Sequence, residues 1–155
     1  MKSEIEKFGL DLNPLILNEE SENREKFMKN KNHNVIITSY GILSRDIDII
    51  SKIKFHTVFL DEAQKIKNPN SLAHKAARQI NTKNKFCLTG TPIENNLIEL
   101  WSLFDFIMPG YLFSLDKFKT RFVTNTENNV LLNHLVKPFI LRRTKKELLT
   151  ELPDK

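Results

Sequence analysis

Four short apolar runs, separated by helical patterns, constrain the fold of this chain of 155 residues more than any other feature. Three of the runs are almost continuous in β-branched, aromatic or large aliphatic residues. Continuous runs are typical of strands buried on both faces of a parallel sheet, whereas alternating runs are typical of half-exposed strands. The predicted strands are Pro14 to Leu17, Val35 to Thr38, Thr57 to Leu60 and Phe86 to Leu88.

Helical periodicity occupies the segments between and after these strands. Ser71 to Ile80 gathers its apolar residues on one side, which predicts an amphipathic helix. Asn96 followed by Glu99 resembles a capping box and predicts a second helix, which Pro109-Gly110 should end. Alternating strands and helices are typical of an α/β sheet. After Pro109 the pattern indicates helices only, so we expect a sheet region over residues 1–110 and a helical excursion over 111–155.

Composition and charge narrow the classes of partner. A net charge of +5 mildly favours a polyanion as the binding partner. The basic run from Arg142 to Lys146 would by itself more often be a solvated helix face. No segment approaches the roughly 18 continuous apolar residues of a membrane span, so no membrane partner is expected. One cysteine, Cys87, favours a reducing cytosol and is expected to be a small buried apolar residue.

Two adjacent carboxylates, Asp61 and Glu62, follow the predicted strand from Thr57 to Leu60. In open parallel sheets, ligands bind outside the carboxyl ends of the strands. A nucleotide triphosphatase needs one carboxylate there to hold Mg²⁺, usually through water, and a second to orient or deprotonate the attacking water. Asp61 fits the first role and Glu62 the second. A plain helix N-terminus gives the same dipeptide, so the pattern alone leaves both interpretations open.

A second polar segment, Thr89-Gly90-Thr91-Pro92, leaves the last predicted strand. Gly90 permits a tight turn with φ > 0, and the Thr89 and Thr91 hydroxyls flank it. A turn capped by threonine would have the same sequence. Two such segments, each at the carboxyl end of a predicted parallel strand, indicate a shared site more strongly than either one alone.

In their order along the chain, these segments resemble the motifs of the Swi/Snf family, within the superfamily-two helicase-like ATPases. Asp61 to Asn68 resembles motif II, with the Gln64 that is common in bacterial and archaeal members. Leu88 to Asn95 resembles motif III, Val35 to Tyr40 the motif that touches the DNA backbone, and Pro138 to Lys145 the segment closing the first lobe. The resemblance implies a partial RecA-like parallel sheet over residues 1–110, with 111–155 as a helical protrusion and the end of that lobe.

The resemblance also implies roles for single residues. Asp61 would hold Mg²⁺ through water and Glu62 would activate the attacking water, with ATP and Mg²⁺ as cofactors. Gln64, Thr89, Gly90 and Thr91 would couple the nucleotide site to the DNA groove. Thr38, Ser39, Arg142 and Arg143 would contact phosphates of double-stranded DNA, which positions a motor without reading sequence. A DNA-bound protein such as the transcription machinery would be a further partner, in a prokaryotic, nucleoid-associated cytoplasmic setting.

The sequence contains no phosphate-binding loop of the form G-x-x-x-x-G-K-[ST], because none of its glycines (Gly9, Gly41, Gly90, Gly110) is followed by lysine. In the family this loop lies upstream of the first residue here, and arginine fingers lie downstream. Because phosphoryl transfer needs these parts together, we expect the isolated chain to lack meaningful ATPase activity. The missing strand should also leave strand edges and apolar surface exposed.

Three functions therefore stay open, in descending order of support. The first is part of lobe one of an ATP-driven translocase on double-stranded DNA. The second is a non-catalytic, truncated module that binds nucleic acid or protein. The third is an RNA helicase lobe, which would usually carry Ser-Ala-Thr where this chain has Thr-Gly-Thr. The four histidines show no paired metal-ligand spacing, so no zinc site is predicted.

Overall fold

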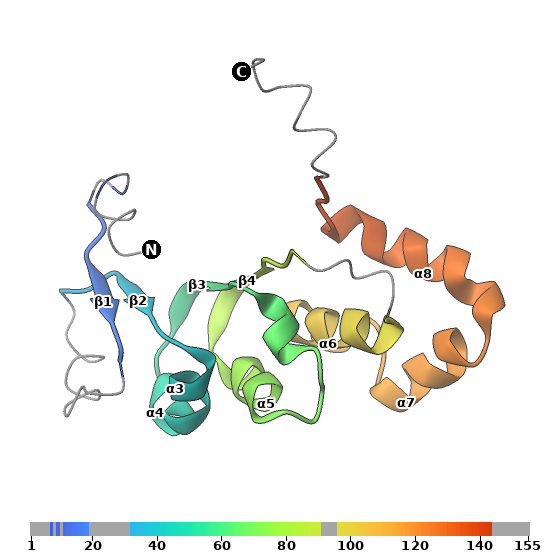
Figure 1. The fold of residues 1–155 in the computed structure, drawn as a ribbon, viewed down its shortest axis with the longest axis horizontal. Helices are drawn as coiled ribbons and strands as arrows, with labels where there is room; N and C mark the ends of the chain where they lie inside the picture. The colour runs from blue at the N-terminus through green and yellow to red at the C-terminus, as the bar shows by residue number, and fades with distance from the viewer. Residues whose placement is uncertain (1–6, 8, 10, 19–31, 91–95, 144–155) are drawn as a thin grey trace, which may run out of the picture. The chain divides into compact units, whose positions relative to one another are not determined.

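A computed structural model describes residues 7, 9, 11–18, 32–90 and 96–143, which fall into two compact units, Met1–Phe113 and Ser114–Lys155 (Figure 1). In the described part of the first unit, β1 (Pro14–Ile16) pairs in parallel with β2 (Val35–Ile37), and β3 (Phe55–Leu60) pairs in parallel with β4 (Thr82–Cys87). All four predicted strands are therefore present, and the parallel α/β class is confirmed.

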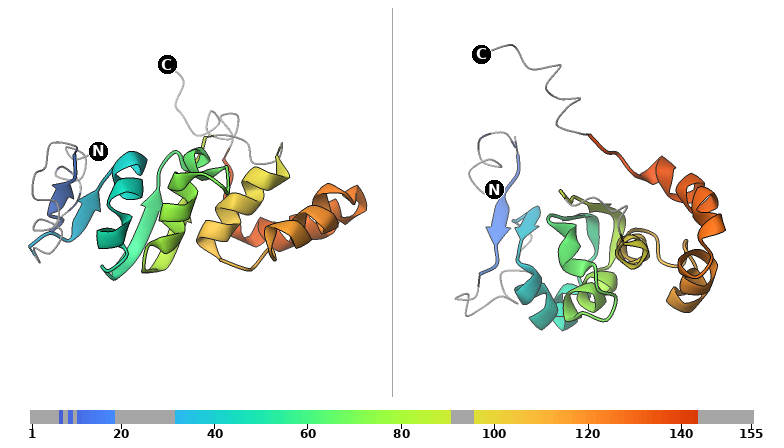
Figure 2. Two further views of the ribbon diagram at one scale, coloured as in Figure 1. Left: turned by 90° about the horizontal axis from the view of Figure 1, so that it is seen from below. Right: turned by 45° about the vertical axis from the view of Figure 1, so that its right-hand side comes forward.

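Helices cover one side of these strands. α3 (Tyr40–Arg45) and α4 (Ile47–Ile50) follow β2, α5 (Leu72–Gln79) connects β3 to β4, and α6 (Leu97–Ile107) follows β4. A 3₁₀ turn, η1 (Ala63–Ile66), lies directly after the carboxylate pair. α3 and α5 lie side by side (Figures 1 and 2), and both contribute to the core. The sequence pattern predicted α5 and α6 but missed α3 and α4.

The capping box predicted at Asn96 is present in part. Asn96 Oδ1 accepts hydrogen bonds from the backbone N–H groups of Ile98 and Glu99, at 3.0 and 3.4 Å. Glu99 returns to the Asn96 side-chain amide at 3.3 Å and pairs with Lys67 at 3.2 Å. These contacts satisfy amides of the first helical turn, which otherwise lack partners. The helix ends at Ile107, as the Pro109-Gly110 pair predicted.

The regular elements described in the second unit are all helical. The unit contains α7 (Leu115–Phe118), the π-helical turn η3 (Lys119–Val123), η4 (Thr126–Asn128), α8 (Asn129–Val136) and η5 (Lys137–Phe139). Phe118 and Phe122 are fully buried and pack with ring centroids 5.2 Å apart. Helices without strands agree with the sequence pattern after Pro109. The assignment of this region as the end of a RecA-like lobe stays a prediction.

The prediction that the strands are buried on both faces is wrong for β3 and β4. Leu60 belongs to the core, but Phe59 is 63% exposed and Phe86 49% exposed. The two rings stack on each other with centroids 5.0 Å apart. Nothing among the described residues covers this face of the two-stranded sheet.

A buried polar cluster fastens the turn after the carboxylates to the helices. His74 Nε2 lies 3.0 Å from Asp105 Oδ2, and His74 Nδ1 lies 3.2 Å from the Ile66 carbonyl oxygen. Ser102 donates its hydroxyl to the Lys67 carbonyl at 2.8 Å. The backbone at the end of η1 is thereby held to α5 and α6. Trp101 is buried beside His74.

Candidate functional site

The polypeptide makes an unusual turn at Asp61 and Glu62, directly after β3. Glu62 adopts the left-handed conformation, with φ 50° and ψ 49°. For a residue with a Cβ this costs about 1–3 kcal/mol, and such residues cluster at functional sites. The Asp61 carboxylate accepts a hydrogen bond from the Glu62 N–H at 2.9 Å. Both carboxylates are exposed at the carboxyl end of the strand, where the sequence predicted them.

The segment leaving β4 holds this turn in place. The Leu88 N–H donates to the Leu60 carbonyl at 2.8 Å, and the Ala63 N–H donates to the Leu88 carbonyl at 2.9 Å. Backbone hydrogen bonds thus flank the Asp61–Glu62 turn on both sides. The parallel register of β3 and β4, with Leu60 opposite Cys87, brings the two polar segments together.

Gln64 connects the two predicted motifs through its side-chain amide. Gln64 Nε2 donates to Glu62 Oε2, and the Thr89 hydroxyl donates to Gln64 Oε1 at 2.8 Å. A carboxylate can only accept a hydrogen bond, so the nitrogen of the Gln64 amide must face Glu62. The oxygen of the same amide accepts from the Thr89 hydroxyl. Glu62, Gln64 and Thr89 therefore form a continuous chain of hydrogen bonds from one strand end to the next.

Gly90 does not behave as the sequence analysis expected. Its φ lies outside the left-handed region, and a Cβ built on it would meet nothing within 4 Å. The turn after β4 therefore needs neither a positive φ nor a small residue at this position. Thr91, the second predicted hydroxyl, lies outside the described residues.

Thr38 and Ser39 lie between β2 and α3, and both are exposed. Ser39 is the N-cap of α3, because its Oγ accepts from the Ile42 N–H at 3.3 Å. Both residues line a cleft of about 550 Å³, whose walls also include β3 and Asp61. The predicted DNA-contact segment and one predicted catalytic carboxylate therefore border the same cleft. Arg142 and Arg143 belong to the second unit, and both are exposed.

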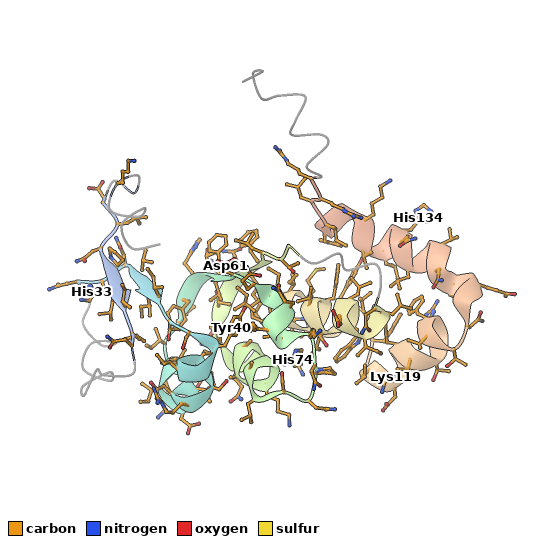
Figure 3. All side chains as sticks on the ribbon, viewed as in Figure 1. His33, Tyr40, Asp61, His74, Lys119 and His134 are labelled. Carbon is orange, nitrogen blue, oxygen red and sulfur yellow. The ribbon has the colours of Figure 1, made fainter. Side chains whose placement is uncertain are left out.

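Tyr40, which the sequence analysis did not single out, joins the two walls of the cleft. Its hydroxyl donates to the Asp61 carbonyl at 2.8 Å, across 21 positions of sequence (Figure 3). Burial raises the pKa of Tyr40 to about 12, and Cys87, Asp61 and Glu62 add to the shift. The hydroxyl therefore keeps its hydrogen and remains a donor. Tyr40 stands next to Thr38 and Ser39 in sequence, but only the fold shows that its side chain reaches Asp61.

A magnesium ion is compatible with Asp61 as a single carboxylate ligand. Mg²⁺ prefers oxygen ligands and usually keeps several waters, binding proteins through one or two carboxylates together with substrate phosphates. Asp61 is exposed and its Oδ1 already accepts from Glu62 N–H. The described residues contain no group of three or more side chains arranged as a metal cage. Asp61 thus suits a hydrated ion shared with phosphates, and not a metal enclosed by protein.

No helix in the described part of the chain is long and apolar enough to cross a membrane.

Comparison with known proteins identifies the family. A family model described as the SNF2-related domain matches residues 2–155. An uncharacterized ATP-dependent helicase of Mycoplasma pneumoniae is 42% identical over 158 residues, covering 99% of this chain and 15% of the helicase. Human TATA-binding protein-associated factor 172 is 40% identical over 142 residues, covering 81% of this chain and 8% of the factor.

A solved structure extends the match to three dimensions. The Sulfolobus solfataricus SWI2/SNF2 ATPase core in complex with dsDNA aligns with a TM-score of 0.86 at 34% identity. The alignment covers 98% of this chain and 33% of the solved chain. The chain thus spans a third of that core and a smaller share of its curated relatives. By sequence and by its RecA-like α/β fold, this chain belongs to the SNF2-related family.

Proposed function

We propose that this chain supplies the Mg-ATP hydrolysis carboxylates and DNA backbone contacts of an ATP-driven translocase on double-stranded DNA. The observation that carries the proposal is the hydrogen-bonded chain from Glu62 through Gln64 to Thr89. A plain helix N-terminus after β3 would need no such link. Family membership supports ATP use, since the Mycoplasma relative is named an ATP-dependent helicase.

Each carboxylate has a distinct role in this proposal. Asp61 holds a hydrated Mg²⁺, which neutralises charge on the phosphates when it is bound. Glu62 orients the attacking water and accepts its proton. The hydrogen bond from Gln64 fixes the direction of the Glu62 carboxylate, and the bond from Thr89 fixes Gln64 in turn. Gln64 and Thr89 thereby couple the state of the nucleotide site to the segment leaving β4. Gly90 and Thr91, the next residues in sequence, take part in the same coupling in this proposal.

The exposed hydroxyls of Thr38 and Ser39 contact phosphates of duplex DNA in this proposal, and Arg142 and Arg143 add charge from the second unit. The Sulfolobus solfataricus core, which is solved with dsDNA, supports duplex DNA as the partner. Such contacts bind without reading sequence and weaken as salt concentration rises. The name of the human relative supports a protein of the transcription machinery as a further partner. A prokaryotic, cytoplasmic and nucleoid-associated setting is part of the same proposal.

ATP hydrolysis by a chimaera tests the proposal. Residues 2–155 would replace the matched segment of the Sulfolobus solfataricus core, which supplies the rest of an ATPase core. The chimaera should hydrolyse ATP, faster with duplex DNA, and Glu62→Gln should lower turnover by about 100-fold or more. Glu127→Gln, the same chemical change at an exposed position of the second unit, is the matched control. DNA-stimulated turnover that survives Glu62→Gln would reject Glu62 as the base.

The second candidate is a non-catalytic module that binds nucleic acid or protein. Under this alternative the folded chimaera would bind duplex DNA but would not hydrolyse ATP, whether or not Glu62 is intact.

A further inference from the structure

We propose that Tyr40 is a positioning residue that transmits DNA contact at Thr38 and Ser39 to the Asp61–Glu62 turn. This inference rests on the proposed function for the identity of the bound polymer. It connects Thr38 and Ser39 to the carboxylates, whereas the hydrogen bonds of Gln64 connect Glu62 to Thr89. The contact that carries it is the hydrogen bond from the Tyr40 hydroxyl to the Asp61 carbonyl.

The contact acts on the peptide group between Asp61 and Glu62. The carbonyl oxygen of this peptide accepts from Tyr40 at 2.8 Å, and its N–H donates to the Asp61 carboxylate at 2.9 Å. The peptide plane is thereby held at both ends. The next backbone torsion is the φ of Glu62, which stands at the strained value of 50°. Tyr40 thus anchors the plane from which the Glu62 side chain is aimed.

The backbone of Tyr40 is joined directly to Thr38 and Ser39, the proposed DNA-contact residues. It is the first residue of α3, directly after Thr38 and Ser39. The Tyr40 carbonyl accepts from the Ser44 hydroxyl at 2.9 Å, and the Ser39 carbonyl accepts from the Leu43 N–H at 2.9 Å. A phosphate that shifts Thr38 and Ser39 therefore moves the first turn of α3 as one body, and the half-buried tyrosine ring moves with it.

Tyrosine suits this task because its ring packs and its hydroxyl donates. The ring borders the cleft that Thr38, Ser39 and Asp61 also line. Burial raises the pKa of the hydroxyl to about 12, so it donates at every working pH. Phenylalanine would preserve the packing and delete only the hydrogen bond. Tyr40→Phe therefore separates transmission from folding.

Hydrogen exchange in the 155-residue chain, with and without a short DNA duplex, tests this proposal. The readouts are the amides of Glu62 and Ala63, together with the dissociation constant for the duplex. Tyr111→Phe is the matched control, since Tyr111 is the other tyrosine of the sequence and stacks on Phe104 beyond α6. Without DNA, Tyr40→Phe should speed exchange at both amides about 2- to 10-fold, as expected for one lost hydrogen bond, and Tyr111→Phe should not.

With DNA, the wild-type chain should gain protection at Glu62 and Ala63. Tyr40→Phe should bind the duplex with an unchanged dissociation constant but lose that gain. An equal gain in Tyr40→Phe, or no change at these amides when wild type binds DNA, would overturn the inference. If wild type binds no duplex, the DNA part of the proposed function fails and the transmission fails with it. The exchange rates without DNA would still show whether Tyr40 positions the turn.

Discussion

Replacing Asp105 by alanine removes the acceptor that fastens α5 and the end of η1 to α6. The Asp105 side chain is 6% exposed and lies 3.0 Å from His74 Nε2 and 3.2 Å from Arg78 Nε. The other nitrogen of His74 faces the Ile66 carbonyl. Both ring nitrogens thus lie within hydrogen-bond distance of an oxygen. Asp105 is the carboxylate that His74 and Arg78 share.

The expected cost of Asp105→Ala is about 3 kcal/mol of unfolding free energy, at the lower end of the range for breaking a buried ion pair. One feature of the site reduces the cost. Arg78, at 47% exposure, reaches water when its partner is removed. A loss of this size is still a large share of the roughly 5–15 kcal/mol that stabilises a typical domain.

Urea unfolding of four proteins checks this reasoning: wild type, Asp105→Ala, His74→Ala and the double variant. Because the two side chains share one contact, the double variant should be more stable than the sum of the single losses predicts, by about 1–2 kcal/mol. Asp48→Ala, an exposed aspartate on α4, should change stability by less than about 0.5 kcal/mol. A loss below 1 kcal/mol for Asp105→Ala, or strictly additive losses, would refute the role of this cluster.

Further predictions follow from individual residues. Gly90→Ala should leave stability unchanged or raise it by up to about 1 kcal/mol in urea unfolding, because its φ is not left-handed; a larger loss would contradict the geometry. Burial raises the pKa of Cys87 to about 12, so iodoacetamide at pH 8 should label it only on unfolding, and rapid labelling of folded protein would contradict its burial. The raised pKa values of Cys87 and Tyr40 mean that the folded state holds these protons more tightly. The contribution of these two groups to stability should therefore be constant below about pH 8 and be lost as pH rises towards 12, so thermal unfolding should shift to lower temperature between these pH values. The double substitution Phe59→Thr and Phe86→Thr should reduce self-association measured by light scattering, because it removes the two exposed apolar rings. Unchanged self-association would show that another surface of the chain causes it.

Continuous apolar runs in the sequence predicted where the strands lie. They predicted neither the first residue of β4 nor the exposure of Phe59 and Phe86. β4 begins at Thr82, because the polar residues from Thr82 to Lys85 pair in register with β3. Tertiary pairing outweighed local propensity there. Burial on both faces failed at Phe59 and Phe86, because that expectation needs neighbours that the described residues do not provide.

The candidate site, too, could be predicted from the sequence only in part. The carboxylates and the exit segment could be located from sequence, because their place after apolar strands is a local property. The left-handed backbone of Glu62 could not, since hydrogen bonds from Leu88 and Tyr40 help to hold the turn from distant positions. The resemblance suggested that Gln64 couples the motifs, and the structure supplied the bonds to Glu62 and Thr89.

The central claim is that Gln64 joins Glu62 to Thr89 as one functional unit. DNA-stimulated turnover in the chimaera should therefore be measured for Gln64→Leu, Thr89→Val and the double variant. If the three residues act through one chain of hydrogen bonds, the double variant will lose no more than the worse single variant. If the two losses multiply, Gln64 and Thr89 act independently and the bridge does not carry the coupling.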